Sequence, residues 1–109
     1  MLAELLGSTN KERVLVFLLA RDKAYATEIA QFWTTGLTPV RNALDKLELA
    51  GVLTSETAGR ARLYQFNPRY PLRDELAAML EKTLSLYPVE MRDALLNVRK
   101  RPRRKGKSL

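Results

Sequence analysis

The sequence contains no cysteine and no histidine, and these two absences remove most of the side-chain chemistry that enzymes use. Without cysteine there can be no disulfides, no thiolate nucleophiles and no zinc–thiolate or iron–sulfur sites. Without histidine the commonest general base and the commonest transition-metal ligand are missing. The 12 Asp and Glu residues show no ligand-like spacing, so we expect a protein that is not an enzyme and that binds no metal and no cofactor.

Long apolar runs are also absent. No segment approaches the roughly 18 consecutive apolar residues of a membrane-spanning helix, and residues 1–6 lack the basic start and cleavage site of a signal peptide. A chain of 109 residues is long enough for one hydrophobic core and too short for two ordinary domains. We therefore expect one cytoplasmic domain that has no membrane partner.

Charge is unevenly distributed along the chain. There are 19 Lys and Arg against 12 Asp and Glu, a net charge of +7, but seven of the basic residues follow Val98 with no acid among them. Residues 1–98 are therefore neutral overall. Such a run of like charge predicts a disordered basic tail at 99–109, which serves to bind nucleic acid, to solubilise the protein, or to attach it to an acidic protein or lipid. We favour nucleic acid, through Arg99, Lys100, Arg101, Arg103, Arg104 and Lys105.

Hydrophobic periodicity predicts helices in the first part of the chain. A short apolar arm, 1–8, precedes a helix at 9–20 that opens with a reciprocal capping box between Thr9 and Glu12. Apolar residues surround most of this helix, so we expect it to be central. A polar connection and a short second helix follow, with Thr27 as the N-cap of that helix.

The third helix is predicted over 39–50. Thr38 is expected as its N-cap and Pro39 as its first residue, Gly36 permits a positive φ in the preceding turn, and Gly51 ends the helix. At about 100° per residue, one side is apolar and the other polar. The apolar stripe consists of Val40, Ala43, Leu44 and Leu47. The opposite side carries Thr38, Arg41, Asn42, Asp45, Lys46 and Leu49.

A β-hairpin and two helices complete the chain. Strands are predicted at 52–57 and 62–66 around a tight loop that places Arg60 at the tip, with Arg62 beside it. The helix predicted at 72–87 has a continuous apolar stripe, which covers either the domain's own core or a second copy of the chain, and a last helix covers 89–98. We favour a homodimer through Leu2, Leu5, Leu6, Leu76, Met79, Leu80, Thr83, Leu84 and Tyr87.

The order of these elements resembles a winged helix-turn-helix. The apolar spacing from Ile29 through Leu44, Leu47, Gly51 and Val52 is similar to that of ArsR-like and MarR-like transcription regulators, and the resemblance covers about residues 9–86. It implies a mainly α fold with a small β-hairpin, in which a three-helix core and a wing carry additional C-terminal helices. The corresponding segments are a DNA-binding domain at 9–68 and helices at 69–98 that are expected to form the dimer. The resemblance does not imply metal sensing for this chain, because the Cys and His ligands are absent.

The resemblance also implies a sequence-specific DNA-binding transcriptional regulator. Helix 39–50 would enter the major groove, where Arg reads guanine and Asn reads adenine. The base-reading residues would be Thr38, Arg41, Asn42 and Lys46, with Arg60 and Arg62 on phosphates or an adjacent minor groove. A plainer interpretation is a solvated helix face with an Arg41–Asp45 pair and an ordinary hairpin tip. A second hypothesis is a protein-interaction or assembly module with a nonspecific nucleic-acid-binding tail, which Asp45 and the neutral body favour.

Overall fold

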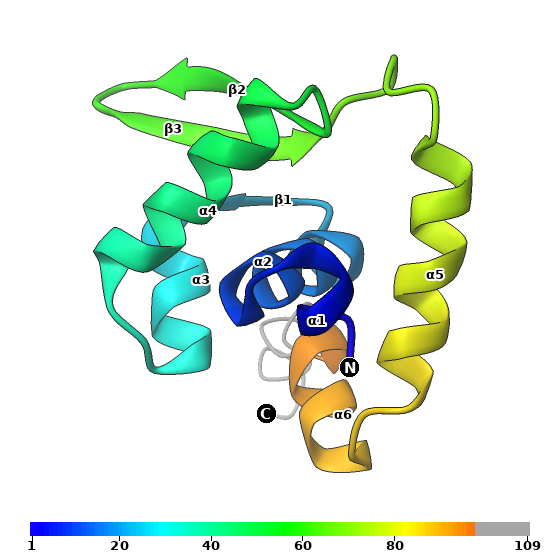
Figure 1. The fold of residues 1–109 in the computed structure, drawn as a ribbon. Helices are drawn as coiled ribbons and strands as arrows, with labels where there is room; N and C mark the ends of the chain where they lie inside the picture. Colours follow the sequence, from blue (N-terminus) through cyan, green and yellow to red (C-terminus); the bar gives the residue numbers. More distant parts are fainter. Residues whose placement is uncertain (98–109) are drawn as a thin grey trace, which may run out of the picture.

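A helix of 13 residues, α2 (Thr9–Arg21), lies at the centre of the structure, a computed structural model that describes residues 1–97 (Figure 1). Its apolar side chains, Phe17 and Leu18 among them, are buried on nearly every side, which confirms the predicted central position. Around it lie α1 (Ala3–Leu6), α3 (Ala26–Trp33), α4 (Leu37–Leu49), α5 (Arg73–Ser85) and α6 (Val89–Asn97), with strands β1 (Lys23–Tyr25), β2 (Leu53–Ala58) and β3 (Ala61–Phe66). The predicted winged helix-turn-helix with additional C-terminal helices is confirmed.

The sheet has three strands in the order β1-β3-β2, both pairs antiparallel. The hairpin β2–β3 is the predicted wing, and its register places Ala58 opposite Ala61 next to the tip. Strand β1 lies where the sequence predicts only a polar connection, so that prediction is wrong. Ala24, in the middle of β1, is buried opposite Tyr64. The base of the wing is therefore fixed to the segment that enters α3.

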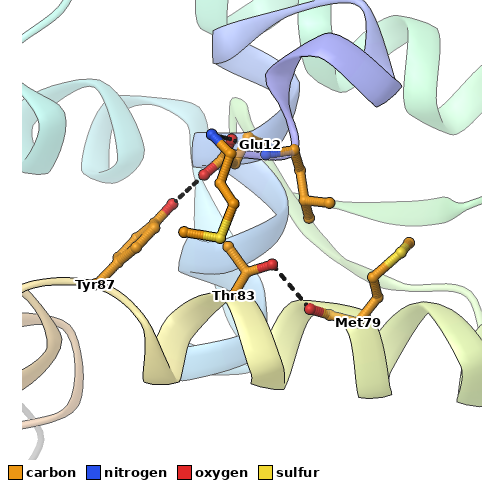
Figure 2. A network of polar contacts seen from close by, with 6 residues as sticks. Glu12, Met79, Thr83 and Tyr87 are labelled. Atoms are coloured by element: carbon orange, nitrogen blue, oxygen red, sulfur yellow. Dashed lines mark hydrogen bonds and ion pairs between the residues drawn. The ribbon is translucent and has the colours of Figure 1, made fainter.

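The start of α2 corrects the predicted capping box. Ser8 is the N-cap, and its Oγ accepts a hydrogen bond from the backbone N–H of Lys11 at 3.2 Å. Glu12 is only 6% exposed, and its side chain turns instead toward α1 and α5 (Figure 2). It accepts hydrogen bonds from the Leu2 backbone N–H (2.8 Å), the Met1 amino group (3.3 Å) and the Tyr87 hydroxyl (2.6 Å).

This network sets the charge state of Glu12. Burial raises the pKa of Glu12, but the hydrogen bonds from Tyr87, the Leu2 backbone and the Met1 amino group outweigh it, so the pKa lies below its ordinary value. Burial also raises the pKa of Tyr87, and its hydrogen bond to the Glu12 carboxylate raises it further. The pair is therefore a carboxylate facing a neutral phenol, which is the combination that makes a strong charge-assisted hydrogen bond.

The second and third helices begin earlier than predicted. Tyr25, not Thr27, is the N-cap of α3, and its backbone N–H donates to Glu28 Oε1 at 2.7 Å. Helix α4 begins at Leu37 with Gly36 as its N-cap, so Pro39 lies third in the helix. That position tolerates proline because the first-turn N–H groups have no helical acceptor. Gly36 has φ −68°, so the positive φ that glycine permits is not used here; a Cβ at this position would lie 3.3 Å from the Pro39 ring.

The end of α4 follows the prediction more closely. Gly51 has φ +85°, the left-handed conformation that favours glycine, and the Val52 N–H donates to the Leu47 carbonyl at 3.0 Å. This Schellman arrangement satisfies a carbonyl at the helix end and turns the chain directly into β2. Because this turn is short, it fixes the position of the wing relative to α4.

The C-terminal helices pack on α2. Leu80 of α5 is fully buried, and Thr83 Oγ1 donates to the Met79 carbonyl at 2.9 Å (Figure 2). Arg21, at the end of α2, donates to the carbonyls of Leu95 (2.6 Å) and Ala94 (3.3 Å) in α6. The apolar stripe of α5 therefore covers the core of its own chain. Of the residues we assigned to a dimer interface, Leu2, Leu80 and Thr83 are buried inside the monomer.

An aromatic cluster joins α3 to these helices. Trp33, the last residue of α3, donates from Nε1 to the Arg13 carbonyl at 3.2 Å, and the Arg13 guanidinium lies 5.4 Å from the centre of its ring. The rings of Phe32 and Tyr87 meet Trp33 edge-on at 5.0 and 6.4 Å. These contacts tie the end of α3 to α2 and to the segment that follows α5.

Candidate nucleic-acid interface

Helix α4 presents a polar face that nothing in residues 1–97 covers. Val40, Leu44 and Leu47 are buried and hold the helix against the core. The side chains on the opposite side are exposed, and we call this surface the α4 polar face. It consists of Thr38, Arg41, Asn42, Asp45 and Lys46. The apolar spacing in the sequence therefore identified the correct exposed side, although it misplaced the start of the helix.

The wing meets one flank of the α4 polar face. A hollow of about 360 Å³ lies between α3, α4 and the hairpin. Arg41 and Asp45 line it from α4, and Arg60 and Arg62 line it from the wing. Arg60 lies in the turn beside Gly59, whose φ of +66° allows the tight reversal. The structure thus brings together three arginines that the sequence predicted separately.

The other flank of the α4 polar face borders the start of α2. A second hollow, of about 250 Å³, is lined by Asn42 and Lys46 together with Asn10 and Lys11. Lys11 therefore adds a positive charge close to Lys46. The sequence analysis did not assign Lys11 to this surface, because Lys11 was interpreted only as part of the start of a helix. Nothing in the local sequence indicates that this start lies against α4.

A chain of hydrogen bonds connects the end of α4 to the wing. Ser55 Oγ donates to Glu48 Oε2 at 2.8 Å and accepts from Arg62 Nη1 at 3.0 Å. Arg62 is exposed, so this contact is what orients its guanidinium in the described structure. Burial raises the pKa of the adjacent Tyr64, and the carboxylates of Asp45 and Glu48 raise it further. Acidic and basic groups are therefore interleaved on this flank.

The α4 polar face is not uniformly suited to a polyanion. Asp45 is exposed and, within residues 1–97, forms no ion pair with Arg41, so the predicted alternative pairing is not present. Leu49, at the end of the same helix, is 90% exposed. The six tail residues Arg99, Lys100, Arg101, Arg103, Arg104 and Lys105 lie outside the described residues.

Among residues 1–97, no group of three or more Asp or Glu side chains is placed to hold a metal ion. Within the same range, no helix combines the length and the hydropathy that crossing a membrane requires.

Solved structures with this fold include several of ZitR from Lactococcus lactis. A mutant of that protein is 29% identical with a TM-score of 0.54, over 72% of this chain and 57% of the ZitR chain. Another ZitR mutant, in complex with DNA, is 28% identical with a TM-score of 0.53, over 73% of this chain and 57% of that one. ZitR itself is described as a zinc-responsive MarR family member.

A more distant neighbour shows the same fold. A mutant of MarR from E. coli is 13% identical with a TM-score of 0.61, over 86% of this chain and 67% of that one. No protein-family model and no curated protein matches the chain.

The three-helix core, the exposed face of α4 and the adjoining wing define a winged helix-turn-helix protein. Its structural neighbours are winged-helix regulators of the MarR family. The chain therefore has the winged helix-turn-helix fold of these MarR-family structures, in agreement with the resemblance seen in the sequence.

Proposed function

We propose that the protein is a non-enzymatic, sequence-specific DNA-binding transcriptional regulator. Helix α4 enters the major groove, where Arg41 and Asn42 read base edges and Thr38 and Lys46 contact bases or phosphates. The wing and the basic tail bind the phosphate backbone, which adds affinity without sequence information. The observation that carries this proposal is the exposed α4 polar face, which is held from behind by buried apolar residues and is flanked by the wing arginines.

The neighbours and the second flank add support. A ZitR mutant with the same fold forms a complex with DNA, and its identity to this chain is 28%. Lys11 and Lys46 extend the basic surface along the far side of α4, so both flanks carry positive charge. We further propose that two copies act together, because two α4 helices about 34 Å apart would meet successive major grooves of a palindromic operator.

Operator selection from a random duplex library, followed by salt titration, tests the proposal. The full chain and a variant with its tail Lys and Arg changed to Gln are compared at several salt concentrations. We expect the variant to bind more weakly and with a shallower salt slope, since each lost phosphate contact lowers the slope by about 0.9. Its preference for the selected operator is expected to survive, because α4 supplies that preference. No duplex binding by the variant at low salt would refute the role of α4.

A single substitution tests base reading directly. Arg41→Ala is expected to relax preference at one operator position by about 1–3 kcal/mol. Arg69→Ala is the matched control, because Arg69 is also exposed but follows β3 at the end of the wing away from the tip. An unchanged preference in Arg41→Ala would assign this residue to the solvated side of the helix.

Asp45 and Leu49 favour a second candidate function, a protein-interaction or assembly module. A carboxylate and a 90% exposed leucine on α4 suit a protein surface better than a phosphate backbone. Under this alternative, Leu49→Ala weakens binding to a protein partner. Under the DNA-binding proposal, the same change leaves operator preference intact, so the operator titration also separates the two functions.

A further inference from the structure

Asp45 lies near the centre of the α4 polar face. At about 100° per residue, its side chain projects within roughly 20° of Thr38 around the helix axis, whereas Arg41 and Lys46 project to either side. Asp45 is exposed, and within residues 1–97 its carboxylate forms no ion pair. When α4 lies in the major groove, the centre of its polar face meets base edges and its two sides lie closer to the phosphates. The carboxylate of Asp45 therefore faces the bases.

Positive charge surrounds this carboxylate. Asp45 lines the hollow between α3, α4 and the wing together with Arg41, Arg60 and Arg62. Three cations thus accompany one anion, so this surface still attracts a polyanion. The surplus of positive charge lets Asp45 approach DNA, but within residues 1–97 none of these arginines forms an ion pair with it. Its oxygens are therefore open to a donor on the bound DNA.

The four bases differ in what their major-groove edges offer to a carboxylate, which can only accept hydrogen bonds. Guanine presents two acceptors, and thymine presents an acceptor and a methyl group, so neither can donate. Adenine presents the N6 amino group beside the N7 acceptor, which repels the second oxygen of the carboxylate. Cytosine presents the N4 amino group without an acceptor beside it. Cytosine is therefore the base that best fits Asp45.

We propose that Asp45 selects cytosine in the operator by accepting a hydrogen bond from the N4 amino group, an inference that rests on the proposed function of α4. The same carboxylate rejects guanine and thymine, because their acceptors would face it without a proton between them. Asp45 follows Arg41 by about one helical turn, or about 6 Å along the axis, which corresponds to roughly two base steps. The selected cytosine therefore lies within about two base pairs of the guanine that Arg41 reads.

Operator selection from a random duplex library tests this assignment, with the full natural chain compared with Asp45→Asn and Asp45→Ala. We expect the natural chain to favour cytosine about tenfold at one position. Asp45→Asn should change the preferred base at that position to adenine, because an amide pairs with both N6 and N7. Asp45→Ala should remove the preference at that position and leave the other positions unchanged.

The control is Asp93→Asn, because Asp93 is exposed on α6, which lies apart from α4 and the wing (Figure 1). It should select the same operator as the natural chain, and circular dichroism should show that all variants keep their helices. Both Asp45 variants could instead select the unchanged operator and merely bind every duplex more tightly. Asp45 would then only repel DNA, and the inference would be wrong while the proposed function stands. If the natural chain enriches no operator, the proposed function fails and the inference fails with it.

Discussion

The hydrogen bond from Tyr87 to Glu12 joins the end of α5 to α2 across 75 residues of sequence. Tyr87→Phe removes only the hydroxyl, which donates at 2.6 Å to the carboxylate of Glu12, a buried residue. A hydrogen bond to a charged group contributes about 1.5–3 kcal/mol. Since 1 kcal/mol moves Tm by about 4–8 °C in a domain of this size, we expect Tm to fall by roughly 6–24 °C.

Thermal unfolding followed by circular dichroism at neutral pH measures this effect. Tyr70→Phe is the control, because Tyr70 is also partly buried and its hydroxyl makes no hydrogen bond within residues 1–97. The difference between Tyr87→Phe and the natural sequence should shrink in acid, where Glu12 is protonated and the bond loses its charge. Equal stability of Tyr87→Phe and the natural sequence at neutral pH, or an equal loss in Tyr70→Phe, would refute the reasoning.

Three further predictions concern other parts of the molecule. The pKa of Glu12 in the folded protein lies below its ordinary value of 4.5, so its contribution to stability is present above pH 4.5 and is lost as pH falls through the folded pKa. Urea unfolding at several pH values should therefore show that the free energy of unfolding of Glu12→Gln falls less steeply in acid than that of the natural sequence. An unchanged pH dependence would contradict this role of Glu12. Gly51→Ala should lower the free energy of unfolding by about 1–2 kcal/mol, because Gly51 has a left-handed backbone conformation. Gly51→Asn should lower it less, and equal decreases in the two variants would exclude backbone strain as the cause. Ser55→Ala frees Arg62 from Glu48 and, under the proposed function, should weaken operator binding about fivefold, an effect of about 1 kcal/mol. Ser55→Thr keeps the hydroxyl and should retain affinity, so similar affinities for Ser55→Ala and Ser55→Thr would exclude the orienting role.

The sequence was sufficient to predict the existence and orientation of α4. Its apolar residues repeat with the helical period, and burial of that stripe decides which side faces water. The start of the helix was predicted two residues too late, because Thr38 and Pro39 satisfy the usual preferences for a helix start. The close approach of Gly36 to the Pro39 ring, which accompanies the earlier start, is a three-dimensional contact that residue preferences do not reveal.

Strand β1 shows a different kind of failure. A segment of three residues is too short to display alternation, and its pairing partners lie about forty residues further along the chain. Distance along the chain also explains why the predicted capping box of Glu12 is wrong. The capping pattern is present in the local sequence, but Tyr87, 75 residues further along, provides a stronger hydrogen-bond partner. The two flanks of the α4 polar face could likewise not be predicted from the sequence, because they combine residues from α2, α4 and the wing.

Trp33 is the single tryptophan of the chain, and it sits where α2, α3 and the end of α5 converge. Its indole is held by a backbone carbonyl and by the edges of two neighbouring rings. Trp33 is half-buried, and any movement that withdraws the C-terminal helices from the three-helix core would expose more of its indole to water and shift its fluorescence emission to longer wavelength. The intrinsic fluorescence of Trp33 therefore reports that movement, which can be followed without an attached dye.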